Sequence, residues 1–292
     1  MTWLLWLGLV LGVLAVTAAV LSAYGARRWA DATRMLASHL EAGRPDDKPA
    51  GPAPTTRYDA RELEGLPAPV QRYLRTVLKD GQPIISAVTI DLAGTFNMST
   101  TGEQWKPFTS RQRVVTRHPG FLWDASISML PGLTVRVVDS YILGRGLLHA
   151  TIEGLITMAD IRGEGDIARG EFMRYFAEAA WYPTALLPSQ GVQWEAVDEH
   201  SAHATIVDGP LTLTLLFRFN AAGLIDSFRA EARGSMVGDK MVMAPWEGTW
   251  SNYQVRDGVQ VPFTGEVAWM RPEGRKPYFV GTVASMAFEF PP

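Results

Sequence analysis

Four residues of this 292-residue chain could do acid–base chemistry together if the fold brought them into one cavity. Asp124 and His149 lie in segments that alternate like strands, whereas Arg174 and Glu178 lie four residues apart in a helical segment. A carboxylate pair such as Asp124 with Glu178 would suit a hydrolase or an isomerase, with His149 acting in the same cavity. An enzyme is therefore one of the function classes that the sequence keeps open.

A charged stripe on the predicted helix contains two of these residues. Glu171, Arg174 and Glu178 are spaced by three and four positions, so they share one side of a helix. The simpler interpretation places this side in solvent. We favour it, because a buried charge needs a partner and no sequence pattern shows one.

Aromatic residues give a second candidate site, suited to an apolar ligand. Rings at strand ends or at the exit of a helix often frame the mouth of a cavity. Ordinary core packing is the simpler alternative for the same rings. The predicted ligand-contacting residues are Trp123, Phe172, Phe176, Trp181, Tyr182 and Trp246.

Several function classes have no support in the sequence. It contains no G-x-S-x-G, H-E-x-x-H or P-loop pattern, and its lack of cysteine excludes disulfides and thiolate metal sites. His200 and His203 have H-x-x-H spacing, which we assign to a solvated loop. A net charge of −3 gives no basic field for nucleic acid. We therefore predict no cofactor, no metal and no nucleic-acid partner.

One helix must position many of these candidates. Residues 166–182 carry an apolar side with Phe172 and Phe176 opposite the charged stripe. Asp166 is predicted to cap the start of this helix, and Pro183 to end it.

Almost everything else after residue 83 alternates with a period of two, which indicates strands. Turn signals separate the runs, one of which is a long strand over residues 146–158. A sheet of about eleven or twelve strands cannot stay flat, so it should curl into a half-barrel or barrel. The predicted fold class is mainly β, a large curled antiparallel sheet whose concave face is closed by the mid-sequence helix.

The N-terminal segment has the sequence pattern of a membrane anchor. No charged side chain occurs before Arg27, and residues 2–24 are long enough to cross a bilayer. A cleaved signal peptide is the alternative, but no basic residue precedes the apolar run. We predict a transmembrane helix at 1–26, a juxtamembrane helix and flexible linker at 27–57, and the β domain at 58–292. By the positive-inside rule, Arg27, Arg28 and Arg34 favour a cytoplasmic location for the domain that follows the helix.

Five stretches carry a resemblance to known proteins. Residues 69–74 (PVQRYL), 119–125 (PGFLWDA), 169–188 (RGEFMRYFAEAAWYPTALLP), 245–253 (PWEGTWSNY) and 261–269 (VPFTGEVAW) resemble an uncharacterised bacterial family that usually has one N-terminal membrane helix. The resemblance implies no activity. More distantly, the architecture is similar to the LolA and LolB type of lipoprotein carrier, which implies an apolar concavity and a body outside the cytoplasm.

Three hypotheses follow from the sequence. The first is a membrane-anchored binding module that holds a lipid or other apolar ligand in the concave face of the sheet. The second is the enzyme described above. The third is a scaffold that docks a membrane partner through the edge of its sheet. We expect the soluble domain outside the cytoplasm, with the membrane as a partner.

Overall fold

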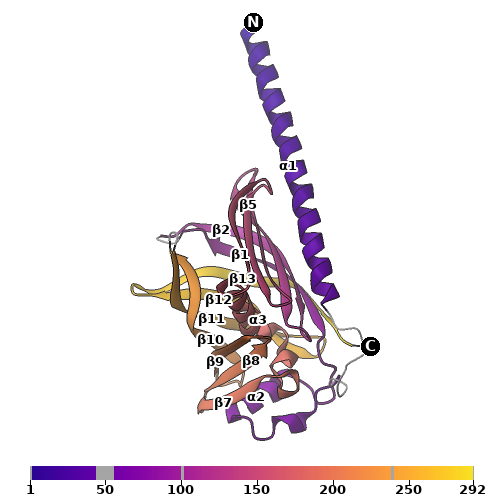
Figure 1. Cartoon of the computed structure of the whole chain (residues 1–292), viewed down its shortest axis with the longest axis vertical. Helices are drawn as coiled ribbons and strands as arrows, with labels where there is room; N and C mark the ends of the chain where they lie inside the picture. Colours follow the sequence, from indigo (N-terminus) through magenta and orange to yellow (C-terminus); the bar gives the residue numbers. More distant parts are fainter. Residues whose placement is uncertain (1, 44–55, 100–101, 238–239, 292) are drawn as a thin grey trace.

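The computed structural model describes residues 2–43, 56–99, 102–237 and 240–291. A long helix at the N-terminus leads into a curled sheet that holds most of the other residues (Figure 1). The predicted fold class, a curled antiparallel sheet with a long apolar N-terminal helix, is confirmed.

One sheet contains thirteen antiparallel strands in the described part of the chain. Their order is β6-β5-β4-β3-β2-β1-β13-β12-β11-β10-β9-β8-β7. Six strands run as a meander from the centre to one edge, and seven return from the other edge to the centre, where β1 pairs with β13. The strands are β1 (Ala87–Asn97), β2 (Trp105–Val115), β3 (Gly120–Leu130), β4 (Leu133–Ile142), β5 (Arg145–Ile152), β6 (Ile156–Gly163), β7 (Gln193–Asp198), β8 (Ser201–Asp208), β9 (Leu211–Phe219), β10 (Ile225–Val237), β11 (Lys240–Arg256), β12 (Val259–Arg271) and β13 (Gly274–Glu289).

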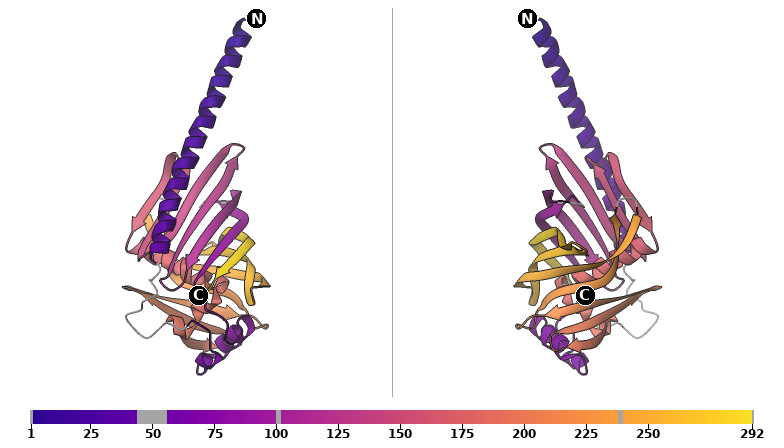
Figure 2. Two further views of the ribbon diagram at one scale, coloured as in Figure 1. Left: turned by 90° about the vertical axis from the view of Figure 1, so that its right-hand side faces the viewer. Right: turned by 90° about the vertical axis from the view of Figure 1, so that its left-hand side faces the viewer.

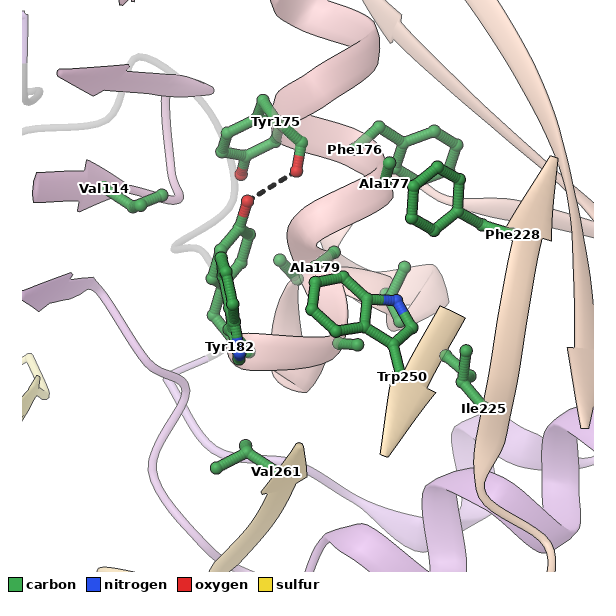
Figure 3. Packing of buried hydrophobic residues seen from close by; sticks show 14 of the residues in the cluster. Val114, Tyr175, Phe176, Ala177, Ala179, Tyr182, Ile225, Phe228, Trp250 and Val261 are labelled. Atoms are coloured by element: carbon green, nitrogen blue, oxygen red, sulfur yellow. Dashed lines mark hydrogen bonds between the residues drawn. The ribbon is translucent and has the colours of Figure 1, made fainter. Parts of the chain in front are cut away.

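Helix α3 (Asp166–Ala177) carries the chain from β6 to β7 through the inside of the curl. It is followed by the 3-10 turns η2 (Glu178–Trp181), η3 (Pro183–Leu186) and η4 (Pro188–Gln190). Figure 3 shows rings of this segment packed against rings and aliphatic side chains of the sheet, with the Tyr182 hydroxyl donating to the Tyr175 carbonyl. The chain's own side chains therefore fill the concave face.

Two short helical segments precede the sheet. These are η1 (Ala60–Leu63) and α2 (Ala68–Val77), which has Pro69 in its first turn. Val70, Tyr73, Leu74 and Val77 are fully buried in the main core, so α2 braces one end of the sheet.

Helix α1 (Thr2–Ala42) runs without a break through the predicted membrane and juxtamembrane segments. It is long and apolar enough to cross a membrane, a criterion that an N-terminal signal sequence also meets. From Gly25 onward α1 lies on the outer face of the sheet, opposite α3 (Figure 2). Trp29 and Leu40 pack there against Val115, Leu122 and Val138 in a second, smaller apolar cluster.

Some local predictions were wrong. Residues 146–158 are not one strand, because Glu153 and Gly154 take positive φ values and turn the chain from β5 into β6. Gly165, with φ 78°, is the residue before α3, so Asp166 is the first helical residue and not its cap. Most of the predicted linker lies outside the described residues.

Candidate functional site

The charged stripe of Glu171, Arg174 and Glu178 faces the inside of the curled sheet. Arg174 donates from Nη1 to Oδ2 of Asp139 on β4 at 2.8 Å and from Nε to Oε1 of Glu178 at 2.8 Å. The amide of Gln112 on β2 donates to Oε2 of Glu178 at 2.6 Å. The side chains of Arg174, Asp139 and Glu178 are at most 14% exposed. The prediction that this stripe faces solvent is therefore wrong, because β2 and β4 supply the partners that a buried charge needs.

Aromatic rings cover the Arg174 guanidinium. Its Cζ atom lies 4.7 Å from the ring centroid of Trp123 and 5.1 Å from that of Phe121. These distances are within the range of cation–π attraction, which strengthens when the cation is shielded from water. The guanidinium is thus fixed by two carboxylates and two rings at once.

A second arginine lies beside this cluster. Nη2 of Arg233 on β10 is 3.9 Å from Oε1 of Glu171, and its Cζ is 4.2 Å from the Trp246 ring centroid. Within the described structure, Oε2 of Glu171 and Nε of Arg233 are buried without a hydrogen-bond partner. Glu171 is thus the most weakly compensated carboxyl of the cluster.

Burial, together with the neighbouring Asp139, raises the pKa of Glu171 to about 8. At neutral pH Glu171 therefore holds a proton. Burial also raises the pKa of Asp139, and the Arg174 guanidinium opposes that rise. Glu171, Arg174, Glu178, Asp139 and Arg233 lie together in the core, and we call these five residues the α3 ion cluster.

The six rings predicted to contact a ligand all lie in the main core. None of them is more than 2% exposed. Trp181, for example, donates from Nε1 to the Pro262 carbonyl at 3.0 Å and packs edge-on against Trp250 at 4.8 Å. Ligand contact by these rings stays a prediction, and it would require α3 to move away from the sheet.

The four residues of the predicted polar site do not form one cluster. Arg174 and Glu178 lie on the concave side, whereas Asp124 and His149 point to the outer face, where both contact Trp29. The Trp29 indole donates from Nε1 to Oδ1 of Asp124 at 2.8 Å and stacks on the His149 ring, with centroids 5.7 Å apart. Burial raises the pKa of Asp124, and the bond from Trp29 opposes that rise.

A groove of about 290 Å³ lies between α1 and strands β4 to β6, and we call it the α1 groove. Its apolar lining includes Trp29, Met35, Leu36, Val138, Leu147 and Leu155, and its basic and histidine side chains are Arg28, His39, His149 and Arg162. Two lining atoms, Nδ1 of His149 and Oγ1 of Thr151, are buried and have no hydrogen-bond partner in the described structure. Nδ1 of His149 lies 3.7 Å from Asp160, which is too far for a hydrogen bond.

The sequence does not predict the α1 groove, because the residues that line its two walls are far apart in the chain. The sequence predicts a juxtamembrane helix that contains Trp29 and Leu36, but no sequence pattern shows which surface this helix contacts. Leu147, His149 and Thr151 alternate on one side of β5, which was the available signal. Among the described residues, no three His, Cys, Asp or Glu side chains are placed to share a metal ion.

Comparison with solved structures finds proteins of low similarity to this chain. A LolA superfamily protein from Nitrosomonas europaea matches with a TM-score of 0.39 and 10% identity, over 77% of this chain and 93% of that one. A domain described as an outer membrane lipoprotein-sorting protein from Vibrio parahaemolyticus matches with a TM-score of 0.34 and 8% identity, over 70% and 86%. Nothing about a ligand or an activity follows from similarity at this level.

No curated protein sequence matches the chain. A family model does match residues 64–288, which covers the sheet, α2 and α3. This range agrees with the resemblance noted in the sequence and includes the segment from Arg169 to Pro188. The chain therefore belongs to a family of unknown function, DUF6920.

Proposed function

We propose that this protein is a membrane-anchored module that binds a lipid or another amphiphile with one apolar chain, and that the ligand lies in the α1 groove. The observation that carries the proposal is the groove itself, with its apolar lining and its two unpartnered polar atoms. Its volume of about 290 Å³ is near the lower end of the range for small-molecule sites. It would hold one chain or part of one.

The anchor in this proposal is the first part of α1. Its large apolar side chains from Trp3 to Leu21 are all at least 49% exposed, and no other part of the described chain covers them. Such a surface is unfavourable in water and favourable in a bilayer. The location of the soluble domain outside the cytoplasm stays a prediction. A reporter fused to the C-terminus tests it.

The chemistry of the groove favours an amphiphile over a purely apolar molecule. Leu36, Leu147 and Leu155 would contact a hydrocarbon chain, whose burial is worth about 0.8 kcal/mol for each methylene. The Thr151 hydroxyl would donate to an ester or carboxyl oxygen, satisfying a group that is otherwise costly to bury. Arg28 would attract a negatively charged headgroup.

This location differs from the concave face that the sequence suggested. The concave face is occupied by α3, whereas the α1 groove is already open. The enzyme alternative gains no specific support, because its four residues are divided between the two faces of the sheet.

Native mass spectrometry of the full chain, released from membranes in mild detergent, tests the proposal. We expect one bound amphiphile on the wild type. Leu147→Trp and Leu155→Trp should each reduce its occupancy several-fold by filling the groove. Val255→Trp is the matched control, because Val255 is an exposed apolar strand residue outside the groove.

Two results would contradict the proposal. One is a wild-type protein that carries no amphiphile after gentle isolation and gains no thermal stability from added lipid. The other is equal occupancy in the wild type and both groove variants, with all proteins folded by circular dichroism.

A further inference from the structure

The sheet touches α1 at the point where the exposed apolar part of the helix ends. Gly25 is the first buried residue of α1, and a Cβ atom at this position would lie 2.0 Å from the Glu153 carbonyl oxygen. Three residues earlier, the Ser22 hydroxyl donates to Oε2 of Glu153 at 3.1 Å. The turn between β5 and β6 is therefore pressed against residues 22–25 of α1.

The turn between β3 and β4 lies at the same end of the sheet. The backbone N–H of Glu153 donates to the Thr134 carbonyl at 2.9 Å, and the Thr134 N–H donates back to the Glu153 carboxylate. These bonds tie the two turns together. Figures 1 and 2 show this end of the sheet pointing along α1 toward the N-terminus.

Both turns carry exposed apolar side chains, and we call this group the hairpin tips. Leu130 is 63% exposed and Leu133 36%, while Ile156 is 63% and Met158 53% exposed. Large apolar residues gathered at one end of a sheet are unfavourable in water and indicate a contact surface.

The length of α1 specifies what covers the hairpin tips. Residues 2–24 span about 34 Å as a helix, which slightly exceeds a hydrocarbon core of about 30 Å. Ser22 then lies where the hydrocarbon ends, and the hairpin tips lie beside it. Arg27 and Arg28 follow within two helical turns, at the depth of lipid headgroups, where anionic lipids attract basic side chains.

We infer that the hairpin tips insert into the interfacial layer of the bilayer that α1 crosses, an inference that rests on the proposed anchoring of α1. The occupant is lipid because the tips are fixed to the helix at the depth where the bilayer surface must lie. Apolar side chains at this depth are stabilised by burial among headgroups and upper acyl chains.

This contact also gives the α1 groove a direct route to the membrane. Gly154 and Leu155, in the turn between β5 and β6, line the groove as well. A lipid that leaves the bilayer at the hairpin tips would enter the groove without crossing bulk water. The unfavourable exposure of its acyl chain would be avoided.

Spin labelling of the full chain in liposomes that contain anionic phospholipid tests the inference. The chain has no cysteine, so single cysteines give unique labels. Leu130→Cys and Ile156→Cys place labels on the tips, Val13→Cys marks the middle of the apolar helix, and Val255→Cys marks an exposed position near the turn at the other end of the strands. Accessibility to oxygen and to a water-soluble nickel chelate reports depth.

We expect an oxygen-to-nickel accessibility ratio at positions 130 and 156 that is several-fold above the ratio at 255 and below the ratio at 13. If the label at position 13 is deep in the bilayer but both tip labels have the same accessibility ratio as the label at 255, the inference is overturned. The proposed membrane anchoring of α1 is then still supported. If position 13 is also aqueous, the anchoring fails and the inference fails with it. Tip labels shielded from both reagents would indicate a second copy of the chain, which also overturns the inference.

Discussion

The indole Nε1 of Trp29 donates a 2.8 Å hydrogen bond to Oδ1 of Asp124, and this bond joins α1 to the outer face of the sheet. The same indole stacks on the His149 ring, so one side chain of the helix contacts both β3 and β5. Trp29 also forms part of the wall of the α1 groove. The groove therefore depends on this attachment for its shape.

Trp29→Phe should weaken the attachment while keeping an aromatic ring over His149. The half-buried Asp124 loses its indole donor, which should lower the free energy of unfolding by about 1 to 3 kcal/mol. Chemical denaturation in detergent, followed by tryptophan fluorescence, measures the change. Trp3→Phe is the control, because Trp3 is exposed on α1 and should leave stability unchanged. Equal effects of the two substitutions would contradict the attachment.

Glu171→Gln should alter how stability depends on pH. The pKa of Glu171 is raised from its ordinary 4.5 to about 8, chiefly by burial, so between these values the native state holds a proton that the unfolded state has released. This carboxyl therefore makes the wild type less stable as pH rises from about 4.5 to about 8.

The glutamine variant lacks this titration. It should match the wild type near pH 4.5 and exceed it in stability near pH 8, as measured by denaturation at both values. Asp91→Asn is the comparison, because Asp91 is a surface carboxyl whose pKa is lowered by Arg111. A difference between wild type and Glu171→Gln that does not change with pH would contradict a protonated Glu171.

Arg174→Met should be among the most destabilising single changes in the chain. It leaves Asp139 and Glu178 buried without their guanidinium partner, at a cost of about 3 to 5 kcal/mol in the free energy of unfolding. Arg111→Met is the matched control. Arg111 also pairs with a carboxylate at 2.8 Å, but its side chain is 71% exposed and should contribute less than about 1 kcal/mol. Similar losses for the two variants would contradict a buried α3 ion cluster.

Gly25→Leu should separate α1 from the turn between β5 and β6. A side chain at this position overlaps the Glu153 carbonyl, whereas Gly8 has no neighbour within 4 Å and makes Gly8→Leu the control. Spin labels on cysteines at Ala32 and Thr157, on opposite walls of the α1 groove, give the distance between helix and sheet. That distance should lengthen or broaden in the Gly25 variant alone. An unchanged distance would show that α1 is not held at Gly25.

The strand pattern and the long N-terminal helix were predictable because each rests on local periodicity. The alternation in Leu211–Phe219 and the uncharged run before Arg27 needed no knowledge of the fold. The β5–β6 hairpin was missed because Glu153-Gly154 is a weak turn signal within a continuous alternating run.

The contacts of the candidate sites were not predictable in the same way. Whether Arg174 faces water or Asp139 depends on the curl of the sheet, which brings residues 35 positions apart into contact. Trp29 and Asp124 are separated by 95 positions. A helix stripe or an alternating strand identifies a face, but only the tertiary structure shows what that face meets.

Photocrosslinking with a phospholipid that carries a diazirine on its acyl chain tests the central claim most directly. The full chain is labelled in liposomes, digested, and mapped by mass spectrometry. Binding in the α1 groove predicts crosslinks in peptides that contain Met35, Leu147 or Leu155, and their loss in Leu147→Trp. Crosslinks at Phe172 or Phe176 on the concave side, or none outside the apolar part of α1, would contradict the claim.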